Sequence, residues 1–100
     1  YGKAATHLET AVSLVPDFAI AYNNLGEAYE GLRRSREARR AYEKALEFDP
    51  DYVDAHLNLG KLLYRSGERK KAAKSFMEVV RLSPESESAM EARRYLSRLR

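Results

Sequence analysis

Proline occurs three times in this chain, at positions 16, 50 and 84, and the spacing is 34 residues each time. Because proline cannot continue an α-helix without losing a backbone hydrogen bond and clashing with the preceding turn, regularly spaced prolines indicate regularly spaced helix ends. The segment AYNNLGEAY (21–29) returns as AHLNLGKLL (55–63), again 34 residues later. The chain therefore repeats a structural unit of this length.

Each unit contains two amphipathic helices, because apolar and small residues recur at intervals of three or four, the spacing of one helix face. One set is Tyr22, Leu25, Gly26 and Tyr29, which returns as His56, Leu59, Gly60 and Leu63; the other is Ala38, Tyr42, Ala45 and Phe48, which returns as Ala72, Phe76, Val79 and Leu82. The period predicts helices at 2–15, 19–32, 36–48, 53–65, 69–82 and 87–99. They should follow one another in antiparallel succession, with no strand.

The small residues indicate how the two helices of a unit meet. A glycine inside a helix lowers helix stability by on the order of 1 kcal/mol relative to alanine. The presence of Gly26 and Gly60 inside predicted helices therefore needs an explanation. We expect Ala38 and Ala72, on the second helices, to pack where these glycines have no side chain. The aromatic residue four positions further on would fill the space beside that contact. One such pair cannot bury its apolar faces alone, so the pairs should stack into an array.

This pattern resembles the tetratricopeptide repeat, and the resemblance covers nearly the whole chain. Its residues are Tyr22, Leu25, Gly26, Tyr29, Ala38, Tyr42, Ala45 and Pro50, followed by His56, Leu59, Gly60, Leu63, Ala72, Phe76, Val79 and Pro84. The resemblance implies an all-α fold, an αα-hairpin solenoid of about six helices wound as a right-handed superhelix. The first helix of each unit would line a concave groove that holds a partner. The usual turn glycine is present as Gly67 but replaced by Arg33 in the first unit, which predicts a different bend there.

The units predict a single domain over residues 1–100. It divides into the second helix of a truncated repeat (1–18), two full repeats (19–52 and 53–86) and a C-terminal capping helix (87–100). The first residue is Tyr1 rather than methionine, which suggests a piece of a longer protein. Since residues 1–15 lack a preceding first helix, we expect their apolar groups to be exposed and to mediate self-association or contact with another chain.

The sequence contains no motif for catalysis or metal binding. It has no cysteine, which excludes disulfides, thiolate metal sites and cysteine nucleophiles. His7 and His56 have no second ligand at metal-binding spacing, and no serine lies in a nucleophile-elbow motif. No apolar run approaches the roughly 18 to 20 residues that span a bilayer. We therefore predict a protein that is not an enzyme, with no catalytic residue, no metal and no cofactor.

Asparagines provide the candidate binding site. Asn24 and Asn58 precede the Leu-Gly pair of each repeated segment, so stacking should place one above the other in the groove. Asparagine offers a carbonyl acceptor and an amide donor, so a ladder of them can pair with the backbone of an extended peptide, and some members of the family use asparagines in this way. The alternative is that they serve packing or solvation without ligand contact. Neighbouring residues would set selectivity: Ile20, Asn23, Glu27, Asp54, Leu57, Lys61 and Tyr64.

The leading hypothesis is a protein-interaction module that holds a peptide or helix of a partner in this groove. A clamp for acidic C-termini, known in the family, is disfavoured because Asn23, Glu27 and Asp54 stand where its cations should be. One alternative is binding of nucleic acid or an anionic surface through basic clusters at 33–40, 69–74 and 93–100. It is disfavoured because aromatic residues do not interleave these clusters and acids dilute them. The other alternative is a structural spacer or self-association unit.

Overall fold

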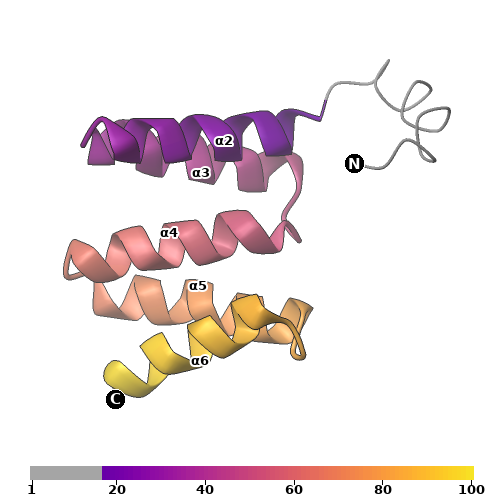
Figure 1. Ribbon diagram of the computed structural model, residues 1–100, viewed down its shortest axis with the longest axis vertical. Coiled ribbons are helices and arrows are strands. Elements are labelled where there is room, and N and C mark those ends of the chain that lie inside the picture. The colour runs from indigo at the N-terminus through magenta and orange to yellow at the C-terminus, as the bar shows by residue number, and fades with distance from the viewer. Residues whose placement is uncertain (1–16) are drawn as a thin grey trace, which may run out of the picture.

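The computed structural model describes residues 17–100, which form helices and no strand (Figure 1). The helices are α2 (Phe18–Gly31), α3 (Ser35–Phe48), α4 (Val53–Arg65), α5 (Arg69–Leu82) and α6 (Glu87–Arg98). Each begins and ends within one residue of its predicted bounds. The all-α hairpin solenoid is thus confirmed. The helix predicted at 2–15, and the self-association expected of it, lie outside the described residues.

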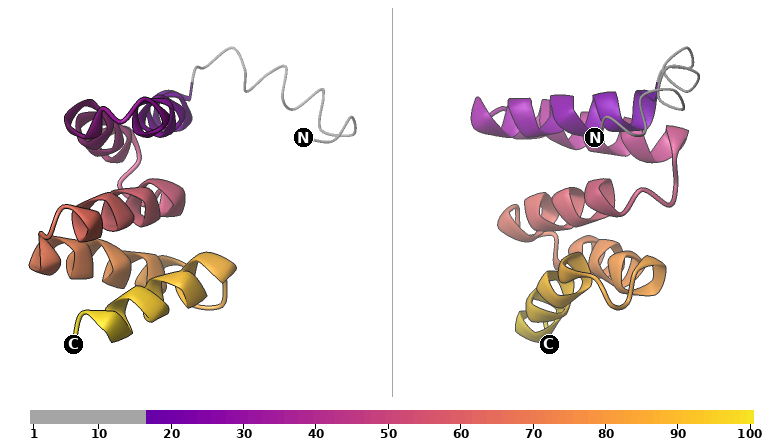
Figure 2. Two further views of the ribbon diagram at one scale, coloured as in Figure 1. Left: turned by 60° about the vertical axis from the view of Figure 1, so that its left-hand side comes forward. Right: turned by 45° about the vertical axis from the view of Figure 1, so that its right-hand side comes forward.

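The helices form two antiparallel pairs and a final single helix, stacked along one axis (Figure 1). α2 packs against α3 and α4 against α5, while α6 packs against α5. α2 and α3 remain side by side in both views of Figure 2. The first helices of successive units, α2, α4 and α6, lie on one side of the stack, and α4 contacts both of the others. We call this surface the α2–α4–α6 face.

Glycine allows a close approach within each pair, although its partner differs from the expected one. A Cβ atom added to Gly26 would lie 2.5 Å from Cε1 of Tyr42, and one added to Gly60 would lie 2.8 Å from Cε1 of Phe76. Both rings are completely buried. The atoms nearest to each glycine thus belong to an aromatic ring of the second helix, and not to the alanine predicted for this contact. A glycine is required at each position because the aromatic ring occupies the volume that a side chain would fill.

The turns after α2 and α4 have the same geometry, so the different bend predicted at Arg33 is wrong. In the first turn the backbone N–H of Arg34 donates to the carbonyl of Tyr29 at 2.8 Å, and residues 34 positions later form the same bond at 3.0 Å. This bond closes a Schellman motif, which needs one residue in the left-handed region. That residue is Gly67, with φ of 81°, in one turn and Arg33, with φ of 59°, in the other. Hydrogen bonding and packing impose the glycine conformation on an arginine.

The core runs through α3, α4, α5 and α6. Its buried members include Ala38, Tyr42, Leu57, Leu59, Leu62, Leu63, Ala72, Phe76, Val79 and Ala92. α6 begins at a serine cap, since Oγ of Ser86 accepts from the N–H of Ala89 at 3.0 Å. It contributes Tyr95, whose ring stacks on Phe76 with the centroids 4.7 Å apart. α6 therefore covers the apolar side of α5.

Candidate functional site

Three of the polar side chains predicted for a binding site meet on the α2–α4–α6 face. Nδ2 of Asn58 on α4 donates to Oδ1 of Asn23 at 3.1 Å and to Oε2 of Glu27 at 3.3 Å, both on α2. Asn23 is only 3% exposed, whereas its neighbour Asn24 is exposed. Asn58 thus pairs with Asn23, one residue away from the expected Asn24. The two hydrogen bonds fix the orientation of the Asn58 side chain.

Contacts between neighbouring first helices do not follow the 34-residue period. Asn23 and Asn58 are 35 residues apart, and so are Glu30 and Arg65, which form an ion pair between α2 and α4. Helical side chains point toward the helix N-terminus, and packed helices cross at an angle. Equivalent positions of two units therefore do not face each other directly. The repeat identifies which residues share this face. To predict which of them form pairs, the register between the two neighbouring helices must also be known.

Carboxylates gather toward the end of the face where α2 and α4 begin. Burial raises the pKa of Tyr52, the residue that precedes α4, and the negative charges of Asp54, Asp17 and Glu27 act in the same direction. A charge has this effect only when it lies close to the titrating hydroxyl. Glu27, one of these carboxylates, also accepts a hydrogen bond from Asn58 and so lies beside the asparagine pair.

Ion pairs join the three helices further along the face. Nζ of Lys61 on α4 lies 3.1 Å from Oε2 of Glu91 on α6, while Arg65 pairs with Glu30 on α2. Glu30 also accepts a hydrogen bond from the hydroxyl of Tyr42 on α3. Burial and this bond together raise the pKa of Tyr42 far above its ordinary value. The sequence did not indicate Glu30 as a site residue, because its distance of 35 residues from Arg65 departs from the 34-residue period.

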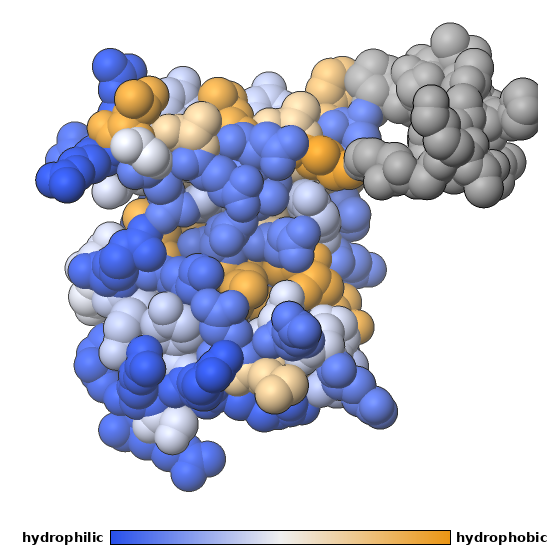
Figure 3. Space-filling model, in the orientation of Figure 1, coloured by the Kyte–Doolittle hydropathy of each residue, from blue (hydrophilic) through white to orange (hydrophobic). Residues whose placement is uncertain are grey.

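The remaining predicted residues divide between core and surface. Leu57 is buried in the core, and Tyr64 packs edge to face against Tyr95 of α6, with the centroids 5.0 Å apart. Asp54 is exposed. A ligand on this face would therefore meet polar groups on α2 and α4 and an aromatic pair toward α6. Figure 3 shows that this side of the molecule is mostly hydrophilic.

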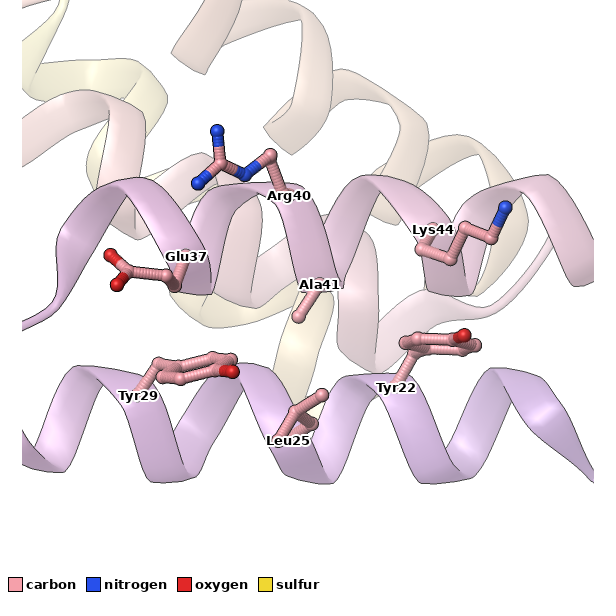
Figure 4. Close-up of a pocket in the computed structure, with 7 residues that line it drawn as sticks. All are labelled: Tyr22, Leu25, Tyr29, Glu37, Arg40, Ala41 and Lys44. Atoms are coloured by element: carbon pink, nitrogen blue, oxygen red, sulfur yellow. The ribbon is translucent and has the colours of Figure 1, made fainter.

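A hollow lies on another surface, the outer side of the α2–α3 pair, which we call the α2–α3 end face. Its lining residues are Tyr22, Leu25 and Tyr29 from α2 and Glu37, Arg40, Ala41 and Lys44 from α3 (Figure 4). Leu25 lies between the two tyrosines, and Ala41 faces it from α3. Hydrophobic residues gather over α2 along the upper edge in Figure 3. This end face thus combines aromatic and aliphatic side chains of α2 with charged side chains of α3.

Among residues 17–100, two members of the predicted basic clusters, Arg39 and Lys71, pair with carboxylates, as do Lys44 and Arg81, which lie outside the clusters. Ion pairs join Arg39 to Glu43 and Glu68, Lys71 to Glu68, Lys44 to Glu47 and Arg81 to Glu78. The hydrogen bond with Glu43 raises the pKa of Arg39. Within residues 17–100 no group of three or more acidic or histidine side chains is arranged to hold a metal ion. None of the helices α2 to α6 has the length and apolar character of a membrane span.

Models of one family match most of the chain. A model described as TPR repeat matches residues 1–32 and 36–67, and two described as Tetratricopeptide repeat match residues 18–48 and 53–86. No curated protein matches the chain significantly. Repeats of this family generally mediate protein–protein interaction and form a non-catalytic scaffold. Because the first model alone covers more than half of the residues, and the helix pairs show the same period, the chain belongs to the tetratricopeptide-repeat family.

Proposed function

We propose that this chain is a protein-interaction module that holds an extended peptide of a partner against the α2–α4–α6 face. The observation that carries the proposal is the hydrogen-bonded set of Asn58, Asn23 and Glu27 beside the exposed Asn24. Among residues 17–100, no side chain donates to Oδ1 of Asn58, and no partner occupies the amide of Asn24. One acceptor and one complete amide are thus available to a peptide backbone.

The fixed orientation of Asn58 favours binding. A side chain that is already ordered by two hydrogen bonds loses little conformational freedom when a ligand arrives, and this reduces the cost of association. The hydrogen bond to the buried Asn23 maintains this orientation of the Asn58 side chain. The three residues thus act as a preformed polar anchor between α2 and α4.

The charges around this anchor suggest which peptides fit best. Glu27 and Asp54 are exposed and lie on the acidic part of the face. A partner segment with a lysine or arginine side chain next to its anchored backbone would meet these carboxylates, whereas an acidic segment would be repelled. The same charges oppose a clamp for acidic C-termini.

The test starts with a ligand selected from a library of extended peptides for binding to this chain. The double variant Asn24→Ala with Asn58→Ala removes the available acceptor and amide. Each substitution leaves polar groups of the ligand unpaired, so each should weaken binding by roughly 1 to 3 kcal/mol. Isothermal titration calorimetry measures this loss, and circular dichroism checks that the helices remain.

Arg40→Glu provides the matched control, because Arg40 is exposed on α3 and lines the α2–α3 end face instead. This variant should bind the selected peptide as tightly as the parent chain. If the double asparagine variant keeps full affinity while Arg40→Glu abolishes binding, the end face is the working surface and the proposed site is wrong.

A further inference from the structure

Basic side chains gather at one end of the helices. The turn from α2 to α3, the turn from α4 to α5 and the last residues of α6 all lie there, on the left in Figure 1. These three segments, residues 30–37, 65–71 and 97–100, carry nine arginines and lysines but only three glutamates. We call them the basic end. Most of its cations are exposed and form no ion pair within residues 17–100, namely Arg33, Arg34, Arg36, Arg69, Lys70, Arg98 and Arg100.

The helices that begin at the basic end do not explain its charge. α3 and α5 both start there, and the N-terminus of a helix carries a partial positive charge that favours acidic side chains. The first turn of α5 nevertheless contains Arg69, Lys70 and Lys71 and no acidic residue. These cations repel one another and the end of their own helix. A bound anion would interact favourably with both.

The two turns at the basic end share a backbone geometry and differ in sequence. Leu32 and Arg33 stand in the first turn at the places of Ser66 and Gly67 in the second. The same backbone hydrogen bond closes both turns. Arg33 also has a positive φ, as Gly67 does, although glycine adopts this conformation more easily. The turn therefore forms without a leucine or an arginine at these positions, which points to a role of both side chains outside the fold.

The exposure of Leu32 indicates what kind of partner fits. Leu32 is 65% exposed, more than any other leucine, phenylalanine or methionine among residues 17–100. Ser66 is exposed as well, although α3 packs on its unit, so this position faces solvent even where neighbouring helices are in place. An apolar side chain among cations suits a ligand that offers an apolar group together with carboxylates. A phosphodiester backbone offers charge but no comparable apolar group.

We propose that the basic end binds an acidic segment of a partner protein, and that Leu32 packs against an apolar residue of this segment. Arg33, Arg34 and Arg36 bond its carboxylates, because the planar guanidinium group can form two parallel hydrogen bonds to a carboxylate. The cations of the α4–α5 turn continue the binding surface along the stack. This surface differs from the asparagine anchor between α2 and α4, and it selects a partner segment of the opposite charge.

A matched pair of double variants tests the proposal in the full chain. Leu32→Ser with Arg33→Gly gives the first turn the residues of the second, so the fold is kept, which circular dichroism checks. Met77→Ser with Lys74→Gln is the control, because it also removes one exposed apolar side chain and one exposed cation, here from α5. The probe is a short fluorescent peptide in which two leucines lie between two runs of glutamate. Fluorescence anisotropy measures its binding.

The turn variant should bind this peptide at least about tenfold more weakly than the parent chain, because it loses both an apolar contact and a charge pair. The control variant should keep the affinity of the parent. Asn24→Ala with Asn58→Ala should also keep it, which separates the basic end from the asparagine anchor. Replacing the two leucines of the peptide by serine should weaken its binding to the parent chain and leave its binding to the turn variant almost unchanged.

Four results would overturn the proposal. The parent chain does not bind the acidic peptide, or the turn variant binds it as tightly as the parent does. A short DNA duplex that binds more tightly than the peptide, and that depends on the same two residues, would assign the basic end to nucleic acid. Sedimentation that shows self-association of the parent chain but not of the turn variant would assign it to a second copy, whose opposite end carries carboxylates in residues 47–54.

Discussion

At the scale of single residues, the two helical glycines show how strictly the fold is specified. The sequence pattern correctly indicated that Gly26 and Gly60 permit a close approach, because a glycine inside a helix needs such a reason. The partner could not be predicted from spacing alone, since both an alanine and an aromatic residue lie on the opposing helix face. In the structure the rings of Tyr42 and Phe76 fill the space.

Substitution of these glycines gives the prediction at this scale. Gly26→Ala should lower the free energy of unfolding by roughly 1 to 3 kcal/mol, because the new Cβ would overlap the buried ring of Tyr42. Gly31→Ala is the matched control, because it lies in the same helix and has open space around it. It should raise stability by up to about 1 kcal/mol. Urea denaturation followed by circular dichroism measures both, and equal effects would contradict the steric argument.

At the scale of elements, the sequence predicted the helices well and their mutual contacts poorly. Periodic apolar residues and prolines set the bounds of α2 to α6 within one residue, because each helix must turn one face to the core. Side-chain pairs between helices depend also on tilt and on the direction of each side chain. For this reason Asn58 meets Asn23 and Glu27, and Glu30 was missed as the partner of Arg65.

The turn between α2 and α3 gives the prediction at this scale. Arg33 holds a left-handed backbone conformation that costs an L-residue with a side chain roughly 1 kcal/mol. Arg33→Gly should relieve that strain and raise the free energy of unfolding by about this amount. Arg34→Gly is the control, because its φ is −101° and there is no such strain to relieve. Chemical denaturation measures the free energy of unfolding of both variants. If Arg33→Gly is no more stable than Arg34→Gly, the backbone of Arg33 is not strained.

At the scale of the whole molecule, the stack presents two surfaces of different character. The α2–α4–α6 face is polar, and hydrogen bonds and ion pairs connect its helices. The α2–α3 end face carries aromatic and aliphatic residues of α2 beside charged residues of α3, and the equivalent positions of the next unit line a hollow together with Arg39 and Glu43 of α3. A polar face with preformed hydrogen-bonding groups suits a ligand that binds and dissociates. We therefore propose that partners bind the α2–α4–α6 face.

The side-chain amides offer the most direct measurement of this assignment. The chain contains three asparagines, Asn23, Asn24 and Asn58, and no glutamine, so the nitrogen-15 NMR spectrum should show three pairs of side-chain amide signals. Titration with the selected peptide should shift the signals of Asn24 and Asn58 strongly, because they would bond to the ligand backbone. The backbone amide signals of Arg40 and Lys44, which lie on the end face, should stay in place. Unchanged asparagine signals together with shifts at the end face would contradict the central claim.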